Sequence, residues 1–188
     1  LPTGPLFLLP THSMTVHSAG TLPHHSYGGD SAGLVCGYLM QGSTPALPLD
    51  STAAAHWLQA HPQATPTVQG GTPRAVAAPF VWLHFNLAHA QALRWIQRHA
   101  QLPDAFFEAL KEGSHSTRIE RDDDALVGVL NDAHFDFAFE PFDIATLWIC
   151  VLPHVVITAR AHPLRSVDAL RTAVRQGYTP RSSVALLE

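Results

Sequence analysis

The segment Phe80–Asn86 places the strongest constraint on how this chain folds. Successive side chains of a strand point to opposite faces, so Val81, Leu83 and Phe85 share one face, and the other face ends with His84. Both faces are largely apolar, which is typical of a strand that is buried on both sides. We therefore expect a central strand in a sheet covered by other elements.

Two helices are expected after this strand, each with one apolar stripe. The second helix has Pro103 in its first turn and Gly113 at its end, which are the favoured positions of these residues. The residues expected to be buried are Ala92, Leu93, Ile96 and Ala100 in the first helix, and Phe106, Ala109 and Leu110 in the second.

The remaining apolar runs predict further strands and helices around this unit. Strands are expected at Leu34–Met40, Thr117–Arg121, Ala125–Leu130, Ala145–Leu152 and Val155–Arg160, and helices at Ser51–Ala60 and from Ser166 to Gly177. The last four strands form two antiparallel hairpins with helices between them, so the expected class is α/β with a mixed, largely antiparallel sheet flanked by helices.

Composition limits the domain organisation and the partners. A chain of 188 residues with 46% hydrophobic residues suits one globular domain, which we place at residues 33–178. Residues 1–32 are rich in Pro, His, Ser, Thr and Gly and are expected to form a flexible arm, and residues 179–188 are expected to begin a linker. The formal net charge of −4 provides no cationic face for nucleic acid.

Neither a membrane span nor a reactive thiol is expected. The segment Ile144–Ala159 is shorter than the ~20 residues of a spanning helix, and Pro153 interrupts it. Cys36 and Cys150 both lie in apolar runs, which favours buried, unreactive thiols.

Three motifs resemble the N-terminal cytoplasmic domain of the CorA-like divalent-metal transporters, and the zinc-transporting ZntB branch in particular. The first is Trp-Leu-His-Phe-Asn at residues 82–86 followed by His89, and the second is Leu102-Pro103 through Leu110 followed by Ser116-Thr117-Arg118 entering a strand. The third is the terminal hairpin followed by a short helix. The resemblance covers about residues 34–177.

The resemblance implies a transport protein rather than an enzyme. Family members are pentamers in which each cytoplasmic domain leads through a stalk helix to two membrane helices, with a Gly-x-Asn signature at the pore mouth. The chain would then lie at the cytoplasmic face of the inner membrane and act through membrane segments C-terminal to it. Its partners would be copies of itself and divalent metal ions, with no cofactor required beyond Zn²⁺ or Mg²⁺ as the transported or regulatory ion.

Three residues are candidate metal ligands. The resemblance implies that Glu108 helps to bind a regulatory divalent cation between subunits, since oxygen ligands suit Mg²⁺. His84 and His89 are candidate zinc ligands because imidazole suits Zn²⁺. Each has a structural alternative: Glu108 as a solvent-facing carboxylate that pairs with Lys111, and His84 as a hydrogen-bonded core histidine.

Other clusters favour structural roles. The acidic run Asp122–Asp124 is expected to solubilise a hairpin tip, because adjacent side chains diverge too much to share one ion. The histidines at positions 12, 17, 24 and 25 form at most a loose metal-binding cluster. Arg118 and Arg121 are expected to form surface pairs beside Glu120, and two tryptophans, at positions 95 and 148, are expected to anchor the core.

Two other functions remain possible on the sequence alone. A stand-alone metal-binding or regulatory module would bind zinc tightly as an isolated chain, with His84 or His89 as a ligand. A small hydrolase would need a pocket with a Ser–His contact, but the chain has neither a phosphate-binding glycine loop nor a His-Glu-x-x-His motif.

Overall fold

The computed structural model describes residues 29–62, 78–113, 117–133 and 144–187. Most of the expected flexible arm lies outside these residues, and so does the histidine cluster at positions 12, 17, 24 and 25. The same holds for Ser116 and for much of the connection before Phe80.

The described residues form one seven-stranded sheet with four α-helices and a short 3-10 helix. The strands are β1 (Leu34–Met40), β2 (Leu47–Leu49), β3 (Phe80–Asn86), β4 (Arg118–Asp122), β5 (Ala125–Ala133), β6 (Ile144–Val151) and β7 (Val155–Arg160). The helices are α1 (Ser51–Ala60), α2 (Ala92–His99), α3 (Asp104–Glu112), α4 (Arg165–Arg175) and the 3-10 helix η1 (Val184–Leu187).

The sheet is mixed, as expected from the sequence. Its strand order is β2-β1-β3-β7-β6-β5-β4, and among these strands only β3 and β7 pair in parallel. Both predicted hairpins are present, as the antiparallel pairs β4–β5 and β6–β7. The parallel pair joins the N-terminal and C-terminal halves of the sheet, so it connects segments that lie more than 70 residues apart.

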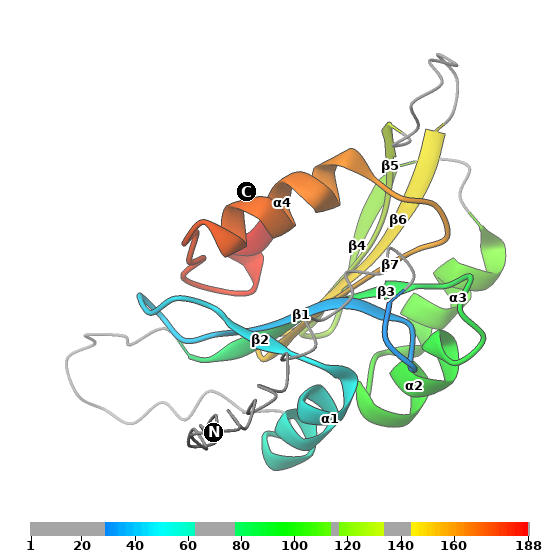
Figure 1. Cartoon of the computed structure of the whole chain (residues 1–188). Helices are drawn as coiled ribbons and strands as arrows, with labels where there is room; N and C mark the ends of the chain where they lie inside the picture. The colour runs from blue at the N-terminus through cyan, green and yellow to red at the C-terminus, as the bar shows by residue number, and fades with distance from the viewer. Residues whose placement is uncertain (1–28, 63–77, 114–116, 134–143, 188) are drawn as a thin grey trace, which may run out of the picture.

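Each face of the sheet carries its own apolar core. Val81, Leu83 and Phe85 of β3 pack into the core under α1, α2 and α3, whereas Phe80 and Trp82 pack into the core under α4. Figure 1 shows this arrangement, with α4 on one face of the sheet and the other three α-helices on the opposite face. The prediction that the Phe80–Asn86 strand is central and covered is therefore confirmed.

Helix α1 has the predicted bounds and α3 ends at the predicted glycine, whereas Pro103 precedes α3 as its N-cap and α4 begins one residue before Ser166. Asp50 is the N-cap of α1 and accepts a hydrogen bond of 2.8 Å from the backbone N–H of Ala53. Gly113 ends α3 with a φ of 70°, a value that glycine adopts without steric cost. One burial prediction is wrong: Leu93 is 40% exposed, whereas Ala92 and Ile96 of α2 are fully buried. Leu110 of α3 is only partly buried.

The chain after α4 folds back onto the sheet. The hydroxyl of Tyr178 donates to the carbonyl of Ala185 at 3.0 Å, and Leu186 of η1 is buried in the core under α4. Residues 179–187 therefore pack against the domain in this structure.

Candidate functional sites

His84 lies in a buried polar cluster between β3 and α4. Trp82 Nε1 donates to Thr158 Oγ1 at 2.9 Å, and Thr158 Oγ1 lies 2.9 Å from His84 Nδ1 but 3.5 Å from the carbonyl oxygen of Leu83. The indole N–H can only donate, so the hydroxyl proton of Thr158 is available for the shorter contact. This geometry favours a neutral His84 whose Nδ1 accepts from Thr158.

The charges around His84 also disfavour its protonated form. Burial, together with the smaller effect of the positive charges of Arg160 and Arg171, lowers the pKa of His84 to about 3. A cavity of about 10 Å³ separates His84 from α4, which is barely the volume of one water molecule. In this structure His84 is therefore a hydrogen-bonded histidine of the core.

His89 lies in the turn between β3 and α2. Its Nδ1 accepts a hydrogen bond from the backbone N–H of Gln91 at 3.3 Å, and its Cβ lies against Gly33. Because Nδ1 is engaged in the turn, Nε2 is the ring nitrogen that remains for a ligand.

Glu108 is exposed on α3, above the outer part of the sheet. It lines a small cavity of about 80 Å³ together with Glu112, Glu120 and Arg118. Arg118 pairs with Glu112 at 2.8 Å and with Glu120 at 3.5 Å, as expected for surface pairs on the edge strand β4. Glu108 is therefore the carboxylate of this cavity that Arg118 does not neutralise.

The described residues bring no group of three or more His, Cys, Asp or Glu side chains into a metal-binding arrangement. His84, His89 and Glu108 lie in three different environments, so a zinc or magnesium site that used any of them would need ligands from outside these residues. The metal roles of all three residues stay predictions.

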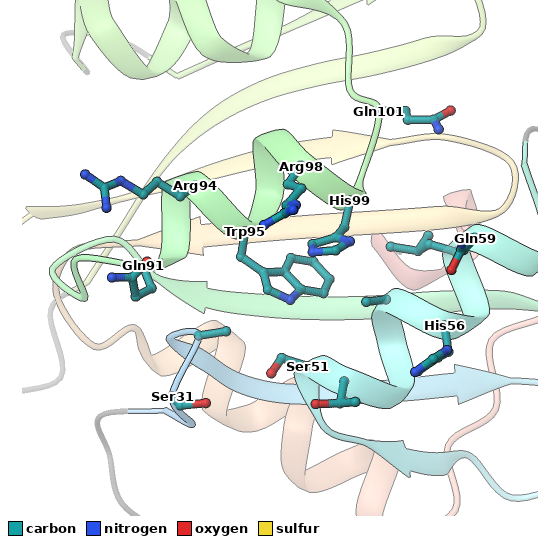
Figure 2. A pocket seen from close by; sticks show the side chains of 14 residues that line it. Ser31, Ser51, His56, Gln59, Gln91, Arg94, Trp95, Arg98, His99 and Gln101 are labelled. Atoms are coloured by element: carbon teal, nitrogen blue, oxygen red, sulfur yellow. The ribbon is translucent and has the colours of Figure 1, made fainter.

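A cavity of about 880 Å³ lies between α1 and α2. In Figure 2, Trp95 and His99 extend from α2 into this space, and His56 lies on α1 across from them. None of these cavity residues was predicted as a site residue, because arginine, histidine and glutamine on short helices carry no sequence motif. The spacing of Arg94 and Arg98 was the available signal, since residues four apart lie on one helix face.

The residues Gly29–Gly33 read Gly-Asp-Ser-Ala-Gly, which fits the Gly-x-Ser-x-Gly pattern of hydrolases. A nucleophile elbow joins a strand to a following helix, whereas this turn leads into β1. The carboxylate of Asp30 accepts from the backbone N–H groups of Ala32 and Leu34, and Ser31 makes no hydrogen bond to a histidine in the described part of the chain. Among these residues, Ser31 therefore lacks the histidine contact that the nucleophile of a small hydrolase would need.

Cys150 and the two tryptophans take structural positions, whereas Cys36, also expected to be buried, is only partly buried. Cys150 is fully buried, and burial raises its pKa to about 12, so this thiol stays protonated. Trp148 Nε1 donates to the carbonyl of Ala109 at 3.1 Å and ties α3 to β6. Trp95 packs on Phe85 with ring centroids 5.0 Å apart.

The described residues thus combine a mixed sheet covered by helices on both faces with a buried polar cluster at its centre. A family model described as "CorA-like Mg2+ transporter protein" matches residues 77–188, which is more than half of the chain. The chain belongs to this family, and the resemblance expected from its motifs is confirmed. The family is one of transporters and not of enzymes.

Individual relatives support the same fold. The chain is 22% identical over 102 residues to the zinc transport protein ZntB of Pectobacterium carotovorum subsp. carotovorum (strain PC1), which covers 54% of this chain and 31% of that protein. The fold of this chain is similar to that of the full-length CmaX protein, with a TM-score of 0.64 and 20% identity. The match covers 85% of this chain and 44% of the CmaX chain. The fold is also similar to the ZntB cytoplasmic domain from Vibrio parahaemolyticus RIMD 2210633, with a TM-score of 0.55, 20% identity, and coverage of 82% and 54%.

The chain spans about a third of the length of the ZntB relative and less than half of the CmaX chain. Within the part of the chain that the structure describes, none of the helices has both the length and the apolar composition needed to cross a lipid bilayer.

Proposed function

We propose that this chain is the cytoplasmic domain of a divalent-cation transporter of the inner membrane, and that it anchors the pore assembly and surrounds the ion path on the cytosolic side. The match of the CorA-like family model from just before β3 to the end of the chain supports this most strongly. In this proposal the domain acts as one subunit of a pentamer, and membrane segments C-terminal to it conduct the ion.

The proposed cargo is zinc or magnesium. Similarity to a zinc transport protein favours zinc, whereas the family description names magnesium. The net charge of −4 would raise the local concentration of either cation near the mouth of the path.

Flux through the complete transporter tests the proposal. The full-length product of the gene that contains this chain would be reconstituted into liposomes that hold a zinc-sensitive or a magnesium-sensitive dye. We expect a gradient of one of the two ions to produce a dye response that protein-free liposomes lack. Absence of flux for both ions, or a gene product without membrane-spanning segments, would contradict the proposal.

Glu108 is the proposed regulatory ligand within this function. Its carboxylate is exposed and free of the Arg118 pairing that occupies its two neighbours, so it can reach a cation shared with another subunit. We expect Glu108→Ala to weaken the effect of internal divalent ions on flux by about tenfold in concentration, while Asp104→Ala, an exposed carboxylate of the same helix, leaves it unchanged. Unaltered dependence on internal ions in Glu108→Ala would remove the regulatory role.

A stand-alone metal-binding module predicts a different outcome for the isolated chain. Calorimetry with Zn²⁺ would then show tight, stoichiometric binding that His84→Gln or His89→Gln abolishes. The transporter-domain proposal expects weak binding that neither substitution changes by more than about twofold.

A further inference from the structure

The cleft between α1 and α2 is large enough for a small organic ligand. Its volume of about 880 Å³ falls within the range of about 300–1,000 Å³ that is common for small-molecule sites. Eleven polar or aromatic residues line it, and Figure 2 labels all of them except Thr52. Most of these side chains can form hydrogen bonds, which favours a charged ligand over an apolar one.

The cleft contains an aromatic surface held in a fixed orientation. Trp95 is half-buried, and its indole packs against the fully buried Phe85 with ring centroids 5.0 Å apart. The imidazole of His99 lies 4.9 Å from the indole, one helical turn further along α2. Phe85 and His99 together fix the orientation of the indole, and the part of Trp95 that lines the cleft can contact a planar ring without rearrangement of the core.

The charge of the lining is positive. Arg94 and Arg98 lie four residues apart on α2, and no Asp or Glu is among the residues that line the cleft. Neither arginine forms an ion pair with a carboxylate of the described residues. Arginine binds phosphate groups with paired, charge-assisted hydrogen bonds, so these guanidinium groups are available for an anionic ligand.

The two carboxylates nearest to the cleft in sequence are engaged elsewhere. Asp30 accepts from the backbone N–H groups of Ala32, Leu34 and Ser51, at 2.9 to 3.0 Å. Asp50 accepts from the backbone N–H of Ala53 at the start of α1. Both carboxylates accept hydrogen bonds from the backbone. They do not form ion pairs with Arg94 or Arg98.

From these observations we propose that the α1–α2 cleft binds a nucleotide, with the base stacked on Trp95 and a phosphate held by Arg98, which lies beside Trp95 and His99, whereas Arg94 extends away from them (Figure 2). The amide and hydroxyl groups of Gln59, Gln101 and Ser51 lie around the same space and supply hydrogen bonds for the base and sugar. The inference does not depend on the transport proposal, because it rests only on contacts among residues of the cleft and the Phe85 ring of β3 behind it.

Isothermal titration calorimetry of the 188-residue chain with three probes tests the proposal. The probes are adenosine monophosphate, adenosine and inorganic phosphate, each titrated in the presence of a metal chelator so that no metal site contributes. We expect the monophosphate to bind at least tenfold more tightly than either fragment, because stacking and phosphate binding act together only in the whole nucleotide. Equal binding of inorganic phosphate and the nucleotide, or no binding of the nucleotide at millimolar concentration, would overturn the proposal.

Substitutions separate the two halves of the site. Arg98→Ala should weaken nucleotide binding about tenfold and leave adenosine binding unchanged, whereas Trp95→Leu should weaken both about tenfold. Trp95→Phe retains an aromatic ring for packing on Phe85 and should weaken binding only about threefold, which keeps the test valid if the leucine variant does not fold. Arg165→Ala removes an exposed arginine from α4, on the opposite face of the sheet, and should have no effect. Equal effects of Arg165→Ala and Arg98→Ala would show a general charge effect and would overturn the assignment to this cleft.

Discussion

His84 Nδ1 and Thr158 Oγ1 lie 2.9 Å apart, at paired positions of the parallel strands β3 and β7. Thr158 also accepts a hydrogen bond from the indole of Trp82, so one hydroxyl satisfies two buried side chains. All three side chains are at least 97% buried, which makes this hydrogen-bonded group part of the junction between the two halves of the sheet.

Replacement of Thr158 by valine should destabilise the domain. The substitution keeps the side-chain volume but leaves the Trp82 N–H and His84 without a partner in the core, which costs about 2–4 kcal/mol of unfolding free energy. Thr158→Ser keeps the hydroxyl and should cost about 1 kcal/mol. Chemical denaturation of the two variants would compare them, and equal stability of the valine variant and the parent chain would contradict this role of the hydroxyl.

The stability of the domain should fall in acid because of His84. Its pKa is about 3 in the folded state and about 6.5 when unfolded, so between these values the unfolded chain binds a proton that the folded chain does not. Stability is therefore full above pH 6.5 and is lost as the pH falls, by about 1.4 kcal/mol for each pH unit. Burial also lowers the pKa of His154, which adds to the loss in the same direction.

Denaturation at several pH values between 4 and 8 would measure this slope. His84→Gln should flatten it by about one proton, whereas His56→Gln, at an exposed position on α1, should leave it unchanged. A slope that is the same in the parent chain and in His84→Gln would show that His84 is not the titrating group.

Asp30 should matter more for stability than the helix cap Asp50. Its two carboxylate oxygens accept three backbone N–H groups, from the start of β1 and from the start of α1, so its loss leaves three donors without their partner. We expect Asp30→Ala to cost about 2–4 kcal/mol and Asp50→Ala about 1 kcal/mol in thermal or chemical unfolding. The reverse order would contradict the structural role of Asp30.

Gly33 should tolerate no side chain. Its φ is +81°, and a Cβ there would lie 2.8 Å from the Cβ of His89 and 3.0 Å from the Cβ of Ala92. Gly33→Ala combines backbone strain with overpacking and should cost about 2–4 kcal/mol. Gly42→Ala is a matched control, because its φ of +63° carries the strain without any neighbour within 4 Å, and should cost about 1 kcal/mol.

Leu186 should contribute to the folded core. Its side chain is 4% exposed under α4, whereas Val184 of the same 3-10 helix is 50% exposed. Leu186→Ala should lower the unfolding free energy by about 2–4 kcal/mol, and Val184→Ala by less than about 0.5 kcal/mol. Similar effects of the two substitutions would show that residues 184–187 do not pack in solution as they do here.

Much of the secondary structure could be predicted from local patterns. The alternation in β3, the bounds of α1 and the end of α3 at Gly113 depend on residues close to one another in the chain, and all three predictions are confirmed. Leu93 was assigned to the buried stripe of α2 because it is apolar, but it lies one position beyond Ala92, about 100° around the helix, and faces solvent. The short strand β2 was missed because three residues carry no usable period.

The candidate sites could be predicted from the sequence only in part. The structural alternative for His84 followed from its place in the alternating strand, but its contact with Thr158 joins residues 74 positions apart. The α1–α2 cleft is lined by polar side chains from separate segments of the chain. Exposed polar residues follow no regular spacing in the sequence, so no pattern there marks the cleft. The turn at Gly29–Gly33 matches a catalytic pattern in sequence, and only its position before β1 shows that it lacks the setting of a nucleophile elbow.

The amino-acid sequence by itself determined the helices, most of the strands, the two-sided burial of β3 and membership of the CorA-like family, because these follow from short-range periodicity and local motifs. The tertiary structure decided that β3 and β7 pair in parallel, that the chain after α4 returns to the core, and which polar side chains are sealed inside or exposed in a cleft. The physical reason is that these features depend on contacts between distant segments, whose free energy is set by packing and desolvation and not by neighbouring residues in the chain.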